Sequence, residues 1–382
     1  MFLSLCWCVG AYPTQILDIN LETRRSSHLT VHRDDNIISL SFIKLCSIFH
    51  SIMVIINRRS SFLATITAMF SLSPASPFSN SAASSSTSVG ASSSSLGLSL
   101  GDVGVVGCGV LGTSLCKQCL ERDDCASVVG ITKSETRHAQ IMDEVGNMDR
   151  FHTETMEKAL ELVPERRFKN IVFCAPPSGS DDYAASVELA FALWDKDQGG
   201  TFVFTSSGAV YDASNGAVVD ETSSTFDPKD SPRAARLLYA EECCRHNDGT
   251  VLRLAGLYTL ERGAHNFFLS KDEISRRPDG VLNTLHYDDA AGACLAALIR
   301  GSSSGVSIRK RTFLISDGHP STRLGVCESS VKSKIYAGKK IPTFNTMPGD
   351  TDIGKTYNGS ASNKELDWKP RYQSFDAFMS VH

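Results

Sequence analysis

Residues 103–112 read Val-Gly-Val-Val-Gly-Cys-Gly-Val-Leu-Gly, an apolar run that passes directly into three glycines spaced G-x-G-x-x-G. Apolar residues then recur four apart at Leu111, Leu115 and Cys119, which predicts a helix. A second apolar run over 127–131 predicts another strand. Strand, glycine loop, helix and strand within about 30 residues form the context in which this glycine spacing predicts a dinucleotide site.

The three glycines of the loop have separate physical tasks. Gly107 permits a tight turn, Gly109 lets a pyrophosphate approach the backbone, and Gly112 lets the helix pack closely against the strand. Free N–H groups at the helix start, where Val110 and Leu111 lie, and the positive helix end would face the phosphates. We therefore expect these five residues to bind a cofactor; the alternative is an ordinary glycine turn.

The end of the second strand bears on which nicotinamide cofactor binds. An acid there would hold the ribose 2′-hydroxyl of NAD, but no acid comes before Glu135. Thr132, Lys133 and Arg137 instead suit a 2′-phosphate, whose charge Lys and Arg can neutralise. We predict NADP as the cofactor, with NAD as the alternative; a solvated loop would also be rich in Lys and Arg.

Strands and helices continue to alternate along the chain. Three more apolar runs predict strands, over 171–174, 201–205 and 251–254. Apolar residues on one helical face lie between Tyr183 and Trp194. The alternation predicts an α/β fold, a doubly wound parallel Rossmann sheet with a small C-terminal substrate-side subdomain. We expect a Rossmann core over 101–260 and a substrate-side part over 261–382 that is woven with it.

Four later segments extend the pattern. They are Thr-Ser-Ser-Gly-Ala-Val-Tyr over 205–211, Leu-Arg-Leu-Ala-Gly-Leu-Tyr over 252–258, Leu-Asn-Thr-Leu-His-Tyr-Asp-Asp over 282–289 and Ser-Asn-Lys-Glu-Leu-Asp-Trp-Lys-Pro over 362–370. With the glycine loop, their order resembles the extended short-chain dehydrogenase/reductase superfamily, the fold of sugar-nucleotide epimerases and dehydratases. The resemblance covers about residues 102–380.

This resemblance implies roles for particular residues. Ser207, four residues before Tyr211, matches the catalytic serine of the superfamily. Ala175 and Pro176 follow the third strand and are expected beside the cofactor. Tyr211 and His286 are expected on the substrate side, where His286 either contacts substrate or only caps a turn.

One segment departs from the superfamily's pattern. The resemblance implies a Tyr and, four residues later, a Lys that together move a proton as hydride moves. Residues 231–241 keep the flanking Ser-Pro and Glu, but Arg233 stands at the Tyr position and Leu237 at the Lys position. Tyr239 does not restore the pair, because Cys243 stands four residues later. An Arg has a pKa above about 12 and is no general acid near neutral pH, so the usual relay is absent.

By this resemblance, the loss of the Tyr–Lys pair places the chain with the atypical members of the superfamily, which keep the glycine loop and the fold. Three functions remain open. The first is an NADP-binding, dehydrogenase/reductase-like protein acting on a small molecule, with Ser207 and Arg233 as candidate catalytic residues. Arg233 would pair with a carboxylate or phosphate, or would simply face solvent. The second is a catalytically silent NAD(P)-binding sensor or scaffold. The third is a sugar-nucleotide epimerase or dehydratase with a relocated acid/base.

Composition argues against several other classes. A net charge of −4 lacks the basic footprint of a nucleic-acid binder. The 12 cysteines are unevenly spaced, which favours a reduced compartment. Cys116 and Cys119 have a metal-site spacing, but they lie within the predicted helix and no second pair follows at zinc-site spacing. We expect no metal, no nucleic acid and no membrane partner, and a monomer or homodimer.

The first 100 residues differ from the rest. Residues 61–100 contain 15 serines and no Asp, Glu, Lys or Arg, so they cannot bury enough apolar surface to fold. A Ser-rich, acid-poor stretch is typical of an organelle transit peptide, and Met53 and Met69 are possible internal starts. Residues 41–56 are apolar but shorter than the roughly 20 residues of a spanning helix. We expect a disordered extension and a chloroplast location, with mitochondrion or cytoplasm as alternatives.

Overall fold

The computed structural model describes two compact units, Met1–Ala91 and Ser92–His382. In the second unit it describes residues 99–146, 149–303 and 307–382. In the first unit it describes the backbone of two antiparallel strand pairs: β1 (Phe2–Leu5) with β2 (Leu17–Asn20), and β3 (His28–Arg33) with β4 (Asn36–Ser41). These strands lie within the extension for which the sequence predicts disorder. The Ser-rich stretch up to residue 98, with its predicted transit peptide, lies outside the described residues.

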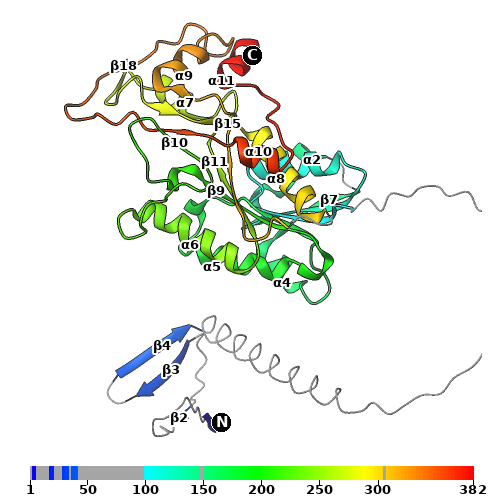
Figure 1. Cartoon of the computed structure of the whole chain (residues 1–382). Helices are drawn as coiled ribbons and strands as arrows, with labels where there is room; N and C mark the ends of the chain where they lie inside the picture. The colour runs from blue at the N-terminus through cyan, green and yellow to red at the C-terminus, as the bar shows by residue number, and fades with distance from the viewer. Residues whose placement is uncertain are drawn as a thin grey trace, which may run out of the picture. The chain divides into compact units, whose positions relative to one another are not determined.

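A seven-stranded, wholly parallel sheet forms the centre of the second unit (Figure 1). In spatial order its strands are β16 (Thr312–Ile315), β11 (Thr250–Leu254), β9 (Phe202–Ser207), β8 (Asn170–Phe173), β5 (Gly101–Val106), β6 (Cys125–Thr132) and β7 (Phe151–Thr155). The chain runs outward from β5 to β7 and then returns across β5 to β8. This confirms the predicted doubly wound Rossmann sheet, in which ligands bind beyond the strand ends where the order reverses.

Helices cover both faces of the sheet, which is why its strands are nearly continuous apolar runs. One face carries α2 (Val110–Leu120), α3 (His138–Val145) and α8 (Tyr287–Ser302), whose buried side chains share one core cluster. The other carries α4 (Met156–Glu161), α5 (Tyr183–Ala190) and α6 (Pro232–His246), which lie together in Figure 1. All five residues of β11 are buried, Arg253 included, and Arg253 requires a buried partner for that reason.

The helix predicted between Tyr183 and Trp194 is shorter than expected. Its α-helical part ends at Ala190, and Phe191–Leu193 forms a single 3₁₀ turn. The indole of Trp194 donates a hydrogen bond to the carbonyl of Lys169 at 3.0 Å, and Trp194 forms a parallel bridge with Phe168 just before β8 begins.

The segment beyond residue 260 contributes β16 to the sheet and also forms a smaller layer with its own aromatic core. That layer holds α7 (Ala264–Leu269), α9 (Arg323–Ser330), α11 (Phe375–Val381) and the strand pairs β13 (Glu273–Ile274) with β18 (Thr343–Phe344) and β14 (Val281–Leu282) with β17 (Ser321–Thr322). β12 (Gly256–Tyr258), from just before this segment, joins it by pairing with β15 (Thr284–His286). α10 (Ser360–Glu365) packs instead against β16, and β19 (Lys355–Tyr357) pairs with β10 (Ala217–Val219). Within the residues that the structure describes, no helix is long and apolar enough to cross a membrane.

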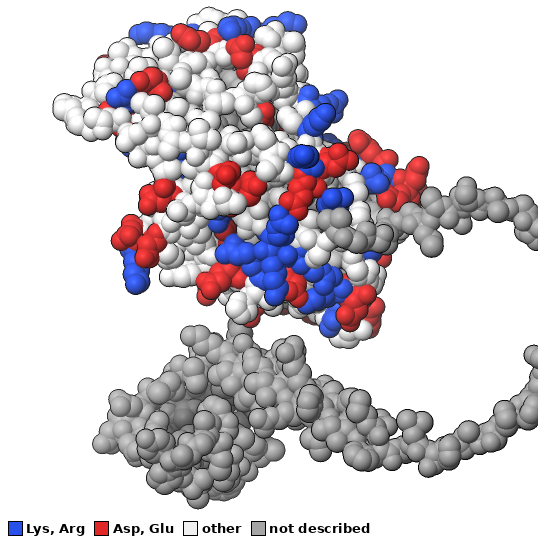
Figure 2. Space-filling view, viewed as in Figure 1, with Lys and Arg blue, Asp and Glu red and all other residues white. Residues whose placement is uncertain are grey.

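Charged side chains of both signs are interspersed on the face shown in Figure 2. Its largest group of Lys and Arg side chains has Asp and Glu side chains directly beside it. The mixture follows from the near-balanced charge of the chain, and it creates no broad field of one sign on this face.

Candidate functional site

The glycine loop lies at the carboxyl end of β5, next to the point where the strand order reverses. Gly107 has a φ of +95°, and a Cβ there would lie 2.3 Å from the backbone nitrogen of Ala175. A Cβ on Gly112 would lie 2.6 Å from the carbonyl oxygen of Gly107. Both glycines are therefore required for the turn and for the close helix–loop contact.

Gly109 differs from the other two glycines because it opens onto free space. A Cβ added there would have no atom within 4 Å. Gly109 is the N-cap of α2, and no side chain caps that helix end. The following Val110 is 40% exposed, whereas Leu111 is buried. The loop thus leaves a helix N-terminus open at the position where a pyrophosphate would approach, so the residues fit a dinucleotide.

The carboxyl end of β6 lies beside the loop, since the amide of Gly107 donates to the carbonyl of Ile131 at 2.8 Å. Thr132 Oγ1 donates to the carbonyl of Ser134 at 2.8 Å and lies 2.7 Å from His138 Nε2. Lys133 is exposed, and its Nζ donates to the carbonyl of Gly179 at 3.2 Å. Lys133 therefore spans from the end of β6 to the loop that follows β8.

Arg137 is also exposed and lies in the 3₁₀ turn Glu135–Arg137 after β6. Its Nε donates to Gln140 Oε1 at 3.2 Å. Its guanidinium belongs to the same strand-end region as Lys133, which places two cations near the edge where the adenosine ribose binds in this fold.

Ala175 and Pro176 follow β8 after Cys174 and face the glycine loop across the strand-order reversal. Ala175 packs against Gly107, and Pro176 is exposed. The hydroxyl of Tyr183, from the start of α5, donates to the carbonyl of Ala175 at 2.8 Å. This hydrogen bond ties the segment after β8 to the start of α5 and so holds Ala175 in place against the glycine loop.

Ser207 ends β9 and is half-buried. Its Oγ accepts a hydrogen bond from the amide of Ala209 at 3.2 Å. The preceding Ser206 donates to the buried carboxylate of Glu241 at 2.6 Å, and Glu241 accepts from Arg253 at 2.7 Å. This buried ion pair connects α6 to β9 and β11, so Ser207 projects from a rigid strand end.

The α6 positions that depart from the superfamily's pattern have different surroundings. Arg233 is exposed in the first turn of α6, and among the described residues no hydrogen bond or ion pair engages it. Leu237 is 9% exposed and packs into the core cluster between α5, α6 and the sheet. Tyr239 is 54% exposed. No contact joins Arg233 to Ser207 in the described part of the chain, and the catalytic role predicted for each stays a prediction.

Tyr211, expected on the substrate side, is completely buried. The guanidinium of Arg253 lies 4.7 Å from its ring centroid, and the ring of Tyr357 stands edge-on at 6.2 Å. Its hydroxyl has no hydrogen-bond partner among the described residues, and burial raises its pKa. These neighbours cover Tyr211, so its hydroxyl is not open to a ligand.

His286 caps α8, which is one of the two roles considered for it. Its Nδ1 accepts from the amide of Asp288 at 3.1 Å, and the side chain is 6% exposed. The imidazole packs among Tyr258, Tyr372 and Phe378, with ring centroids 4.3–5.2 Å apart. Burial lowers its pKa, which favours the neutral ring as a hydrogen-bond acceptor.

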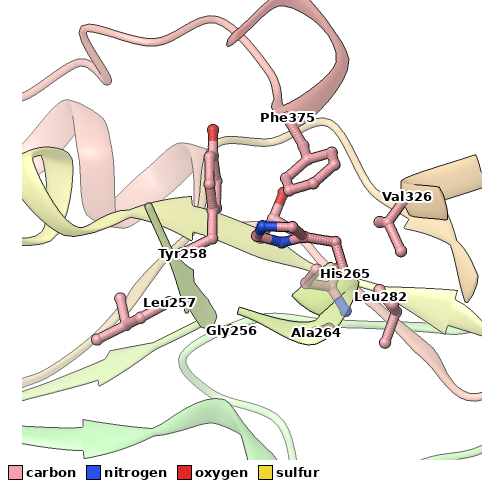
Figure 3. A pocket seen from close by; sticks show the side chains of 10 residues that line it. Gly256, Leu257, Tyr258, Ala264, His265, Leu282, Val326 and Phe375 are labelled. Atoms are coloured by element: carbon pink, nitrogen blue, oxygen red, sulfur yellow. The ribbon is translucent and has the colours of Figure 1, made fainter. Parts of the chain in front are cut away.

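A small cavity of about 70 Å³ lies within the smaller layer (Figure 3). It is lined by Gly256, Leu257, Tyr258, Ala264, His265, Leu282, Asn283, Thr284, Val326 and Phe375. The sequence did not single out His265, which is completely buried beside Phe375. Its Nε2 lies 3.0 Å from the carbonyl of Leu260, and its Nδ1 has no partner in the described part of the chain. The cavity lining carries no formal charge.

Lys355 and Tyr357 on β19 were also missed, because no motif marks them. A Cβ on Gly208, the residue after Ser207, would lie 2.5–2.8 Å from the ring and hydroxyl of Tyr357. Lys355 Nζ donates to the carbonyl of Tyr211. The parallel pairing of β19 with β10, more than 130 residues earlier in the chain, holds this segment near the end of β9.

Solved structures with the same architecture include three UDP-sugar 4-epimerases. The UDP-Glc/GlcNAc 4-epimerase of Campylobacter jejuni is 16% identical with a TM-score of 0.60, covering 73% of this chain and 97% of its own. The UDP-glucose 4-epimerase of Stenotrophomonas maltophila, with bound NAD, is 17% identical with a TM-score of 0.58 and coverages of 73% and 95%. The chain has the fold of the sugar-nucleotide epimerases. A UDP-glucuronic acid 4-epimerase of Bacillus cereus agrees, at 17% identity, a TM-score of 0.57 and coverages of 73% and 96%.

At the level of the fold, these likenesses confirm the resemblance to the extended short-chain dehydrogenases/reductases. No family model matches the chain, and no curated protein does so either. The described residues contain no group of three or more His, Cys, Asp or Glu side chains that could hold a metal ion. Cys116 and Cys119 are completely buried in the core, where burial raises the pKa of both thiols.

Proposed function

We propose that the chain is an NADP-binding protein of the atypical short-chain dehydrogenase/reductase type that acts on a small molecule. The observation that carries this proposal is the open space at Gly109, at the uncapped end of α2 and beside the strand-order reversal. Gly107 and Gly112 are closely packed, so the loop is held in the shape that leaves this space free. Val110 and Leu111 would offer backbone N–H groups to a pyrophosphate.

The preference for NADP is supported by the strand end beyond β6. Lys133 and Arg137 are exposed there, and Thr132 offers a hydroxyl where NAD-binding proteins of this fold place an acid. Two cations suit the extra phosphate of NADP. Two of the similar epimerase structures hold NAD. The NADP preference is therefore proposed for this chain from its own residues and not from those structures.

The small cavity beside His265 does not suit a nucleotide sugar. The cavity of about 70 Å³ is far smaller than the roughly 300–1,000 Å³ of typical ligand pockets, and no Lys or Arg lines it. A diphosphate would find no counter-charge there. An epimerase acting on UDP-sugars, as the similar structures do, therefore requires a substrate path outside this cavity.

A catalytically silent NADP sensor is the second candidate, favoured by the state of α6. Leu237 is part of the apolar core, and Arg233 faces outward without a partner in the described part of the chain. Neither residue can replace the usual Tyr and Lys. This candidate predicts tight cofactor binding with no turnover.

Isothermal titration calorimetry with NADPH and NADH tests the proposal. Binding of NADPH with one site per chain, abolished by Gly109→Val, is the expected result. Failure of both nucleotides to bind a folded protein would overturn both candidates. If NADPH binds, a screen of small aldehydes and ketones at the nicotinamide absorbance separates the reductase from the sensor.

A further inference from the structure

We propose that Tyr357 is the proton donor that α6 no longer supplies, with Lys355 as the cation that supports it. The inference rests on the proposed function, because it requires a nicotinamide cofactor and a carbonyl substrate. It moves the Tyr–Lys pair from the first turns of a helix to neighbouring positions on the short strand β19.

The position of Tyr357 is set by its contact with the end of β9. Its ring and hydroxyl lie so close to Gly208 that a Cβ there would be only 2.5–2.8 Å away. Gly208 follows Ser207, so the hydroxyl lies beside the strand end that carries the candidate catalytic serine. This is the carboxyl edge of the sheet, where doubly wound folds bind their ligands.

Lys355 stands two residues before Tyr357, and side chains two apart on a strand lie on the same face. Its Nζ donates to the carbonyl of Tyr211, whose ring is 6.2 Å from that of Tyr357. Partial burial lowers the pKa of Lys355, while the charges of Asp212 and Asp352 act in the opposite direction. The ammonium group is thus held at Tyr211, the ring neighbour of Tyr357, and lies 5.4 Å from the ring centroid of Phe226.

The strand that carries both residues is clamped by one side chain. Asn283 Nδ2 donates to the carbonyl of Lys355 at 2.8 Å, and Asn283 Oδ1 accepts from the amide of Tyr357 at 2.8 Å. The amide of Asn358 donates to the carbonyl of Val219 at 2.8 Å. β19 is therefore held at a defined height above Gly208, as a catalytic group requires.

The other tyrosines near this edge are unsuited to the task. Tyr211 is completely buried, with its hydroxyl sealed from any ligand. Tyr183 already donates its hydroxyl proton to the carbonyl of Ala175. Tyr239 is exposed on the outer part of α6. Tyr357 is half-buried, and within the described residues no hydrogen bond engages its hydroxyl.

The chemistry that follows is the reduction of a carbonyl group. A bound reduced nicotinamide would supply a hydride to the carbonyl carbon and would itself be oxidised by two electrons. The C=O double bond becomes a C–O single bond, and the oxygen takes the hydroxyl proton of Tyr357. The remaining phenolate is stabilised by the Lys355 cation until solvent returns a proton. Burial raises the pKa of Tyr357, so the phenol carries its proton near neutral pH, although the same burial makes it a weaker acid.

Hydroxyl-radical footprinting with and without NADP⁺ tests the position of Tyr357 independently of turnover. The readout is the oxidation of Tyr357 relative to Tyr239, measured by peptide mass spectrometry, with Tyr239 as the exposed internal reference. A bound ligand covers much of its site, so we expect this ratio to fall roughly three- to tenfold. An unchanged ratio in protein that calorimetry shows to be saturated would overturn the inference and leave the proposed function intact. Absence of NADP⁺ binding would instead overturn the proposed function.

Variants test the chemical role. With any aldehyde or ketone that the wild type reduces, Tyr357→Phe should lower kcat about 10²–10⁴-fold while the Kd of NADPH changes less than about twofold. Lys355→Met should lower kcat and shift the alkaline limb of the pH profile to higher pH. Tyr239→Phe is the matched control and should leave kcat unchanged. A Tyr357→Phe enzyme with the kcat of the wild type would overturn the inference. If the wild type reduces no carbonyl compound, the ratio of Tyr357 to Tyr239 oxidation in the footprinting experiment is the test of the inference.

Discussion

Single residues in the glycine loop separate binding from folding. Gly109 and Gly107 are two positions apart, yet a side chain at Gly109 meets open space whereas one at Gly107 meets the backbone of Ala175. Gly109 also has a φ of −88°, which any residue adopts, whereas Gly107 has a φ of +95°. The same substitution at the two positions should therefore have opposite consequences.

We predict that Gly109→Val abolishes NADPH binding but leaves thermal stability within about 0.5 kcal/mol of the wild type. Gly107→Val should instead destabilise the protein by more than about 2 kcal/mol. The valine would have to adopt a positive φ, and its Cβ would clash with the backbone of Ala175. Calorimetric titration and thermal unfolding of both variants measure the two effects. Retained NADPH affinity in Gly109→Val would show that the phosphates do not approach this glycine.

The cofactor preference also belongs to the residue scale. A charge-assisted hydrogen bond contributes about 1.5–3 kcal/mol, so NADPH should bind roughly tenfold or more tightly than NADH. The double variant Lys133→Ala, Arg137→Ala should weaken NADPH binding to the level of NADH and leave NADH binding nearly unchanged. Equal affinities of the wild type for the two nucleotides would remove the role assigned to these cations.

At the scale of elements, the first turn of α8 holds the C-terminal segment in place. Asp289 is 3% exposed and accepts hydrogen bonds from the amides of Arg371 at 2.6 Å and Tyr372 at 3.1 Å. Burial raises the pKa of Asp289 to about 6, although these two bonds act in the opposite direction. The folded protein therefore binds this proton more tightly than the unfolded chain does.

The stability contribution of Asp289 should accordingly depend on pH. It is fully present below about pH 4, the ordinary carboxyl pKa, and is lost as the pH rises through about 6. The free energy by which Asp289→Asn destabilises the protein should thus be larger at pH 4 than at pH 7, by roughly 1–3 kcal/mol. Urea unfolding at both pH values measures it, and a difference that stays constant with pH would contradict the assignment.

At the scale of the whole molecule, the chain divides between Ala91 and Ser92. The complete Rossmann unit lies after this point, so we expect residues 92–382 expressed alone to keep the unfolding midpoint and NADPH affinity of the full chain. A truncated protein that aggregates or loses binding would show that the N-terminal unit is required for folding.

The proposed chloroplast location is tested separately by the N-terminal sequence of the protein purified from its native tissue. Removal of a Ser-rich transit peptide should leave a mature chain that begins between about residues 85 and 101, before β5. A mature protein that retains Met1 would argue against an imported precursor and favour the cytoplasm.

The sequence alone determined the sheet and the glycine loop, because both depend on local patterns. Buried parallel strands require continuous apolar runs, and the turn at Gly107 requires a residue that accepts a positive φ. The loss of Tyr and Lys at Arg233 and Leu237, which the same local comparison predicts, stays a prediction. Strand β7 reads Phe-His-Thr-Glu-Thr, which has no continuous apolar run, and the sequence therefore did not predict it.

Only the tertiary structure decided the environment of side chains that meet across long sequence separations. It buried Tyr211 under Arg253 and Tyr357, and it made His286 a helix cap. It also brought Lys355 and Tyr357 to the end of β9, more than 140 residues away along the chain. Their contacts arise from the pairing of β19 with β10, a long-range register that no local periodicity specifies.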